Sequence, residues 1–314
     1  MQVVVVGSFN LDHVWQTDSL PAPGATLAGR YHSGPGGKGF NQAIAARRAG
    51  AETAFVCALG DDAGARLASH LAKADGLQLV AHLSPHTPSG SAGIFVDQQG
   101  RNSIVIGAGA NAELTPAHLV AQDTLFRLAK VVLAQLETPI ATVHKALALG
   151  RAAGARTVLN PAPANAESSA ELLALADVIT PNETEFAALI ARHTALQIPA
   201  EAVADASDAV LHSHCRTLHP GGSVIITLGS AGCFVSHGEN WHDDTRSHYR
   251  LPACPSEVVD TTGAGDAFNG AFCAAWAQQP ARALAKHLTF ASRYAARACE
   301  AEGAALAMPQ LAPA

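Results

Sequence analysis

The chain has 314 residues, 48% of them hydrophobic and 15% charged, and its formal net charge is −6. This length and composition predict a globular protein with a substantial core and exclude an intrinsically disordered one. The acidic balance argues against a nucleic-acid partner, and no apolar run reaches the roughly 18 residues that a membrane-spanning helix needs.

The N-terminal residues and the cysteines bear on the cellular compartment. Met1-Gln2 leads directly into the Val3–Val6 run, with no basic region and no cleavage site, which predicts a cytoplasmic protein. The six cysteines are scattered and form no Cys-x-x-Cys pair, so we expect thiols and not disulfides or a zinc site. His212 and His214 lie close to Cys215 and could bind a metal in principle, although surface histidines are the favoured interpretation.

The segment Val3–Gly7, four valines that end on a glycine, has the pattern of a buried parallel strand. Ser8–Asp12 follows at its carboxyl end, where open α/β sheets place ligand-binding groups. The amide of Asn10 and the carboxylate of Asp12 could bind hydroxyl groups in a sugar-sized pocket. A turn made of turn-prone residues is the alternative interpretation of this segment.

Three segments of the N-terminal half do not follow a strand–helix–strand order. Leu20–Ser33 ends in a short alternating stretch, and Ser89–Val96 and Ser103–Ile106 both have the composition of strands. We interpret residues from about 13–35 and 89–107 as a small β-layer that lies outside the main sheet.

The glycine-rich segment that begins at Gly34 could be mistaken for a P-loop. It is not one, because Gly39 follows Lys38 where a P-loop needs Ser or Thr. The pattern predicts a tight turn that opens a helix from Asn41 to Ala49.

Strands and helices alternate along the rest of the chain. Strands are expected at Thr53–Leu59, Val131–Gln135, Thr157–Asn160, Val178–Thr180, Ser223–Leu228 and Cys233–Ser236. This alternation predicts a single α/β domain over residues 1–314, with three layers: a mostly parallel sheet, helices on both of its faces, and the small β-layer in addition.

Several polar residues stand where these strands end. Glu137 follows Val131–Gln135, although an ordinary loop acid would occupy the same position. Asn182 precedes a helix whose first turn contains Glu185, and this arrangement suits a helix N-terminus without any further function. The Thr227–Gly232 segment is explained equally by a plain hairpin turn.

The stretch Val259–Phe272 combines a glycine turn with the start of an amphipathic helix. Gly263 and Gly265 allow backbone N–H groups to converge, and the helix adds its positive end, so the turn is a candidate anion site. Asp266 is placed to accept a proton from a group that attacks the anion, which favours phosphoryl transfer to an alcohol. A helix-capping role for Asp266 is the structural alternative.

Two motifs carry a resemblance to a known family. Asp260-Thr-Thr-Gly-Ala-Gly-Asp266 with the Ala-Phe-Asn-Gly-Ala-Phe that follows, and Gly36-Gly-Lys-Gly-Phe-Asn-Gln42 with its helix, resemble the two signatures of the ribokinase-like (phosphofructokinase-B) carbohydrate kinases. The resemblance runs from about residue 2 to about residue 309. It implies an ATP-dependent kinase with D-ribose O5 as the expected acceptor, and with fructose, another ketose or a nucleoside as alternatives. It also implies that the small β-layer is a lid over the sugar and the surface of a homodimer.

The resemblance assigns roles to individual residues. It implies that Asp266 is the general base and that the backbone N–H groups of Gly263, Ala264 and Gly265 stabilise the transferred phosphate. The sugar would contact Asn10, Asp12, Gly37, Lys38, Asn41, Glu137 and Asp266. Contact with the phosphate is the alternative role of Lys38. The nucleotide would contact Asn182, Glu185, Thr227, Gly229, Gly232 and Gly265.

The resemblance also implies two metal ions. Mg²⁺ would accompany ATP near Asn182 and Glu185, and K⁺ would be bound by Asp260, Thr262, Ala298, Ala301 and Gly303. Two positions depart from the family pattern: Ala305-Leu306-Ala307 replaces a segment that usually contains a serine ligand of K⁺, and Phe40 stands where alanine is usual. A non-catalytic sugar-sensing protein on the same fold is the alternative of another class.

Overall fold

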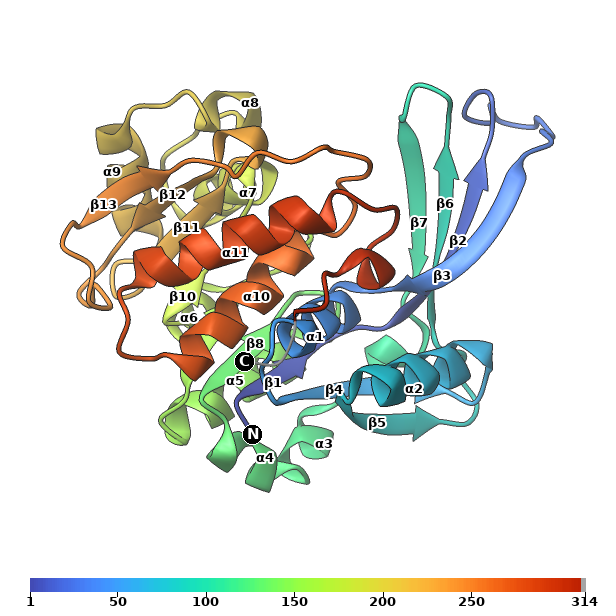
Figure 1. Cartoon of the computed structure of the whole chain (residues 1–314), viewed down its shortest axis with the longest axis horizontal. Helices are drawn as coiled ribbons and strands as arrows, with labels where there is room; N and C mark the ends of the chain where they lie inside the picture. The colour runs from blue at the N-terminus through green and yellow to red at the C-terminus, as the bar shows by residue number, and fades with distance from the viewer. Residues whose placement is uncertain (312–314) are drawn as a thin grey trace.

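A computed structural model of the protein describes residues 1–311, which form two β-sheets and a set of helices (Figure 1). The strands of the main sheet are, in spatial order, β13 (His248–Leu251), β12 (Cys233–Ser236), β11 (Ser223–Thr227), β10 (Val178–Ile179), β9 (Arg156–Leu159), β8 (Val131–Ala134), β1 (Val3–Val6), β4 (Thr53–Gly60) and β5 (Gln78–Ser84). The strands from β11 to β5 pair in parallel, whereas β12 and β13 pair antiparallel. The predicted three-layer α/β fold with a mostly parallel sheet is confirmed.

The central strand β1 explains why helices cover both faces of this sheet. Side chains alternate across a strand, so Val3 and Val5 point to one core and Val4 and Val6 to the other, and all four are fully buried. The first face carries α1 (Lys38–Arg48), α2 (Ala63–Asp75), α10 (Ala264–Gln278) and α11 (Leu284–Ala298). The second face carries α3 (Pro116–Val120), α4 (Asp123–Leu128), α5 (Ile140–Ala152), α6 (Ala170–Ala174), α7 (Glu183–His193), α8 (Ala200–Val203) and α9 (Asp208–Leu218).

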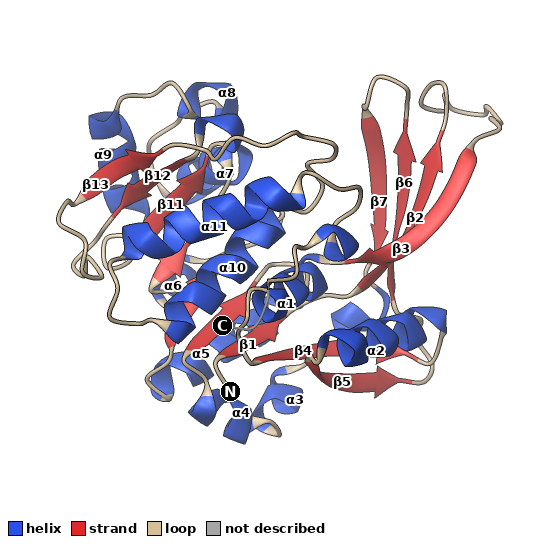
Figure 2. Cartoon of the chain, viewed as in Figure 1, coloured by secondary structure: helices blue, strands red, loops and turns tan. Residues whose placement is uncertain are grey.

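The smaller sheet projects from the body of the molecule (Figure 2). Its strands are, in spatial order, β3 (Arg30–Gly36), β2 (Asn10–Gln16), β6 (Gly90–Val96) and β7 (Asn102–Gly107). We call it the lid sheet. Trp15 packs against Tyr31 and Phe95 within it, and all of β7 is solvent-exposed.

The structure corrects the expected boundaries of some elements. Asn10 and Asp12 lie in strand β2, which begins before the expected lid boundary at about residue 13, and the alternative of a turn does not hold, because β2 is paired on both sides, with β3 and with β6. The helix expected after the glycine turn begins at Ala264, so Asp266 is its third residue. The edge strands β5 and β13 were not predicted, and three short 3₁₀ helices occur at Gly109–Glu113 (η1), Gly229–Ala231 (η2) and Ala305–Ala307 (η3). Among the helices described, none is long and apolar enough to span a membrane.

Candidate active site

The N-terminus of α10 forms one wall of the site. Gly263 precedes the helix with φ of 76°, a left-handed conformation that favours glycine, and a Cβ atom there would lie 2.8 Å from the Cβ of Ala304. Within residues 1–311, the N–H groups of Gly263 and Gly265 have no hydrogen-bond acceptor, whereas the N–H of Ala264 donates to the carbonyl of Thr261 at 3.1 Å. The structure therefore leaves two of the three expected donors free at the positive end of a 15-residue helix.

Asp266 lies in the first turn of α10 and is 7% exposed. Its Oδ2 accepts a hydrogen bond from Nδ2 of Asn41 at 2.9 Å, and its Oδ1 accepts one from Nε2 of Gln42 at 2.8 Å. Burial raises the pKa of Asp266 above its ordinary value, while the Lys38 ammonium and the two amide hydrogen bonds act in the opposite direction. A carboxylate with a raised pKa that accepts fixed hydrogen bonds is suited to general-base chemistry.

Helix α1 brings three polar side chains to this wall from the other signature motif. Lys38, Asn41 and Gln42 all belong to its first two turns, and Gly37 is the residue that precedes the helix. Burial alone would lower the pKa of Lys38, but the carboxylates of Asp266, Glu137 and Glu185 outweigh burial, and the pKa lies above its ordinary value. Lys38 is therefore a positive charge held inside the site.

Glu137 connects the ends of β8 and β1 to α1. Its Oε2 accepts hydrogen bonds from the Ser8 hydroxyl at 2.5 Å and from the backbone N–H of Lys38 at 3.0 Å. Burial and the nearby carboxylates of Glu137 and Asp266 raise the pKa of Asp12 to about 7. The structure thus gathers the carboxylates of Asp266, Glu137 and Glu185 around Lys38, and Asp12 lies near Glu137 and Asp266.

The carboxamide of Asn10 is held by a residue from outside this cluster. Asn111, in η1, donates from its Nδ2 to Oδ1 of Asn10 at 2.9 Å and to the carbonyl of Phe9, and it accepts from the N–H of Phe9. Since Oδ1 of Asn10 is occupied as an acceptor, the NH₂ group of Asn10 is the part of the amide left to meet a ligand.

A polar cavity extends from Lys38 and Asp266 to the second half of the sheet, and the other residues expected at the sugar do not line it: Asn10, Asp12, Gly37, Asn41 and Glu137. Its lining residues are Lys38, Asn160, Ala162, Thr180, Asn182, Glu185, Thr227, Thr261, Gly263, Ala264, Gly265, Asp266 and Asn269. Gly229 and Gly232 do not line it. Gly229 is the first residue of η2 and Gly232 follows its end, and the cavity residue Thr227 lies two residues before η2.

Asn182 and Glu185 also have the structural role that the sequence left open. Oδ1 of Asn182 accepts from the N–H of Glu185 at 2.8 Å, and Oε2 of Glu185 accepts from the N–H of Asn182 at 2.9 Å, so the two residues form a capping box. Burial raises the pKa of Glu185, against the effect of its hydrogen bond to Asn182 and of Lys38. Both side chains therefore cap α7 and face the cavity.

Three of the residues expected at the K⁺ site meet around one carboxylate: Asp260, Thr262 and Gly303. Oδ1 of Asp260 accepts from the N–H of Thr262 at 2.8 Å and from its hydroxyl at 2.7 Å, and Oδ2 accepts from the N–H of Gly303 at 2.9 Å. Ala298 ends α11, and Ala301 lies in the turn that leads to Gly303. Burial would raise the pKa of Asp260, but these hydrogen bonds outweigh it, and the pKa lies below its ordinary value. Carboxylate, hydroxyl and carbonyl oxygens are ligands suited to a hard cation.

Phe40 does not enter the cavity. It is fully buried and packs edge-to-face on Phe9 and Phe55, with ring centroids 5.2 Å and 5.7 Å apart. Its large side chain therefore fills the core between α1 and the sheet.

Sequence reasoning missed three amide side chains of the site. Gln42, Asn160 and Asn269 are almost fully buried, and Asn269 bonds the Thr180 hydroxyl and the carbonyl of Gly265. The two of these residues that lie in helices could have been recognised as polar residues at positions where an amphipathic helix is buried. Asn269, which follows Phe268 in the helix, is an example.

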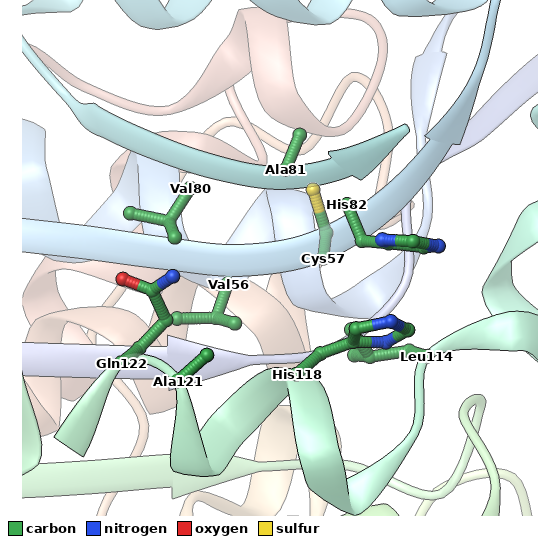
Figure 3. Close-up of a pocket in the computed structure, with 9 residues that line it drawn as sticks. All are labelled: Val56, Cys57, Val80, Ala81, His82, Leu114, His118, Ala121 and Gln122. Carbon is green, nitrogen blue, oxygen red and sulfur yellow. The ribbon is translucent and has the colours of Figure 1, made fainter. Parts of the chain in front are cut away.

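Another hollow lies between α3 and the strands β4 and β5 (Figure 3). It is lined mainly by apolar groups, and the rings of His82 and His118 stack at its rim with centroids 3.7 Å apart. None of the predicted site residues lies there. The described residues contain no group of three or more His, Cys, Asp or Glu placed to bind a metal, so His212, His214 and Cys215 do not form such a group.

Comparison with known proteins agrees with this geometry. The sequence model described as "pfkB family carbohydrate kinase" matches residues 1–311. The chain is 36% identical over 313 residues to a ribokinase of Bacillus subtilis, covering 98% of this chain and 96% of the relative. It is 39% identical over 272 residues to a bifunctional ribokinase/ribose-5-phosphate isomerase A of Fructilactobacillus sanfranciscensis, which is 86% of this chain and 47% of that relative, so it spans about half of the bifunctional protein. Among solved structures, an Arabidopsis thaliana ribokinase complexed with ribose and ATP superimposes with a TM-score of 0.80 at 30% identity, covering 98% of this chain and 95% of that one.

Proposed function

Since the chain belongs to the pfkB family of carbohydrate kinases, we propose that it transfers the γ-phosphoryl group of ATP to O5 of D-ribose. The family supports an ATP-dependent carbohydrate kinase. The choice of ribose rests on the ribokinases among its relatives, and on the likeness to a structure that contains ribose and ATP.

The observation that carries the proposal is the position of Asp266 relative to the free N–H groups of its own helix. Asp266 and Gly265 line the same cavity, so a hydroxyl that donates its proton to the carboxylate would face a phosphate bound by the turn. The hydroxyl oxygen forms the new P–O bond, its proton goes to Asp266, and ADP leaves. The N–H groups of Gly263 and Gly265 stabilise the charge on the transferred group.

We infer that the sugar lies among Asn10, Asp12, Glu137 and the start of α1 at Gly37. Oδ1 of Asn41 supports this position, because it is buried and has no hydrogen-bond partner among residues 1–311. A sugar hydroxyl would satisfy this oxygen, while Nδ2 of the same amide keeps its bond to Asp266.

The nucleotide would occupy the polar cavity, which Asn10, Asp12 and Glu137 of the inferred sugar position do not line. Lys38 provides a cation for the phosphates, and Asn182, Glu185 and Thr227 provide oxygen ligands, with Gly229 and Gly232 in the adjoining turn. Mg²⁺ bound there would neutralise phosphate charge, and it commonly keeps several water ligands. A K⁺ ion at Asp260 and Thr262 would order the same turn, with Ala298, Ala301 and Gly303 contributing backbone oxygens.

The lid sheet supports a homodimer as part of this proposal. Ile104, Val105 and Ile106 of β7 are 49%, 68% and 51% exposed, and no helix of residues 1–311 covers that strand. Exposed apolar strands of this kind are commonly interfaces. Analytical ultracentrifugation would detect the dimer, and a monomer at all concentrations would contradict it.

The proposal is tested by ADP release with Mg-ATP, with and without K⁺, across ribose, deoxyribose, fructose, xylulose, adenosine and no sugar. NMR spectroscopy of the product identifies the phosphorylated oxygen. Turnover on ribose with phosphate at O5 is the expected result. Turnover on another acceptor would contradict ribose while keeping the kinase. ATP and sugar binding without any ADP release would favour a sensor.

A further inference from the structure

We propose that Gln42 is a positioning residue for the reaction: it fixes the carboxylate of Asp266 in the orientation and ionisation state that a general base needs. Gln135 in turn fixes the amide of Gln42. This inference rests on the proposed role of Asp266. Neither glutamine is expected to touch a substrate, because both are fully buried.

The direction of the hydrogen bonds around Gln42 is set by a backbone carbonyl. The carbonyl of Thr180 can only accept, so Asn160 must turn its Nδ2 toward it, at 2.9 Å. Oδ1 of Asn160 then accepts from Nε2 of Gln42 at 3.0 Å. The other hydrogen of that NH₂ group is directed to Oδ1 of Asp266, at 2.8 Å.

Gln135 completes the chain from the opposite side. Its Nε2 donates to Oε1 of Gln42 at 2.5 Å. Every polar atom of the Gln42 side chain is therefore used, and reversing its amide would place two acceptors or two donors against each other at each contact. The position of Gln135, directly after β8, holds this partner on the rigid sheet.

The consequence for Asp266 is chemical as well as geometric. Both of its oxygens accept from amide N–H groups, Oδ2 from Asn41 and Oδ1 from Gln42. Hydrogen bonds of this kind favour the ionised carboxylate, which is the form that can take a proton. Asn41 faces the inferred sugar position, so its amide can form a hydrogen bond to the sugar in place of its bond to Asp266. Gln42 has no alternative hydrogen-bond partner, so its bond to Asp266 is kept when the sugar binds.

Other charged groups also face Asp266 from the elements packed around it. They are Lys38 of α1, Glu137 after β8, Asp12 of β2 and Glu185 of α7. All of them are retained when Gln42 or Gln135 is replaced. A change in the titration of the base would thus report on the amide chain and not on these charges.

The test is the pH dependence of kcat for the full chain with saturating Mg-ATP and the best acceptor of the panel. The variants are Gln42→Met and Gln135→Met, which keep the side-chain length and remove the donors. Thr142→Val is the matched control, because it removes a buried hydrogen bond, from Thr142 to the carbonyl of Leu114, outside the site. Thermal unfolding of all variants measures the structural cost of each.

Loss of a hydrogen bond to the charged form raises the pKa of the base, so the acid limb of kcat should move to higher pH. We expect a shift of about one pH unit for Gln42→Met, a smaller shift in the same direction for Gln135→Met, and none for Thr142→Val. KM for ATP should change less than twofold. If Gln42→Met does not fold, the shift of the acid limb in the pH profile of kcat for Gln135→Met tests the inference by itself.

An unshifted acid limb, with kcat lowered by the same factor at every pH, would overturn the inference and leave only a structural role. Asp266→Asn in the same assay separates this failure from that of the proposed function. If Asp266→Asn retains turnover, the base assignment itself is wrong. If it loses turnover while the limb of Gln42→Met is unshifted, only the inference about Gln42 is wrong.

Discussion

Replacing Asp12 by asparagine should stabilise the protein, and more so at higher pH. Asp12 lies in β2, where burial and the carboxylates of Glu137 and Asp266 raise its pKa to about 7 from an ordinary value of 3.8. The folded protein therefore keeps a proton on Asp12 between about pH 4 and pH 7 that the unfolded chain releases. Stability is greatest below that range and is lost as the pH rises through 7.

The size of the effect follows from the two pKa values. A difference of about three pKa units means that Asp12 lowers the free energy of unfolding by about 4 kcal/mol at pH 8, and by less than half of that at pH 5. Asp12 is partly exposed, so solvent screens its repulsion by the neighbouring carboxylates and reduces this destabilisation. The Asp12→Asn variant should thus gain about 2 kcal/mol more in its free energy of unfolding at pH 8 than at pH 5.

Urea unfolding of the wild type and of Asp12→Asn at both pH values, without sugar, measures this difference. Asp61→Asn is the control, because it removes the same charge from an exposed position at the start of α2. The control should show little difference between the two pH values. An Asp12→Asn variant that gains no more at pH 8 than at pH 5 would refute the reasoning that burial and the carboxylates of Glu137 and Asp266 disfavour the charged form of Asp12.

Two further substitutions test the packing of the site. Phe40→Ala should lower the free energy of unfolding by about 3–5 kcal/mol and leave the order of preferred acceptors unchanged, because the ring is in the core. Chemical denaturation and the acceptor panel check this, and a new preferred acceptor would show that Phe40 shapes the pocket. Gly263→Ala should lower kcat at least tenfold and also destabilise the fold, because the φ of 76° at Gly263 and the close Cβ of Ala304 leave no room for a side chain. Enzyme kinetics and thermal unfolding measure the two effects. A variant with the kcat of the wild type would mean that the turn does not hold the phosphate.

Much of the fold could be predicted from local patterns. The valine run Val3–Val6 and the alternating strands and helices indicated a parallel sheet, and the irregular N-terminal segments indicated the lid sheet. What failed depended on contacts between distant residues. The lid strand β2 begins at Asn10, before the expected boundary at about residue 13, because β3 and β6 pair with it. The edge strand β5 is only partly buried, so its sequence lacks a clear apolar pattern.

The site was predictable where a motif placed chemistry at the end of a strand or the start of a helix. Asp266, Lys38, Asn41 and Glu137 do meet in the structure. Gln42 could not be recognised in this way, because its importance lies in contacts that bring three distant segments together. The direction of the Phe40 side chain was equally inaccessible, since core packing alone decides it.

The most direct test of the account is the comparison of Asp266→Asn with the wild type in phosphoryl transfer, with sugar binding measured by calorimetry on the same samples. Loss of a positioned general base costs about 10²–10⁴-fold in rate, so kcat should fall by that factor while the sugar still binds. If Asp266→Asn turns over within tenfold of the wild type, Asp266 is not the base, and the proposed mechanism is wrong.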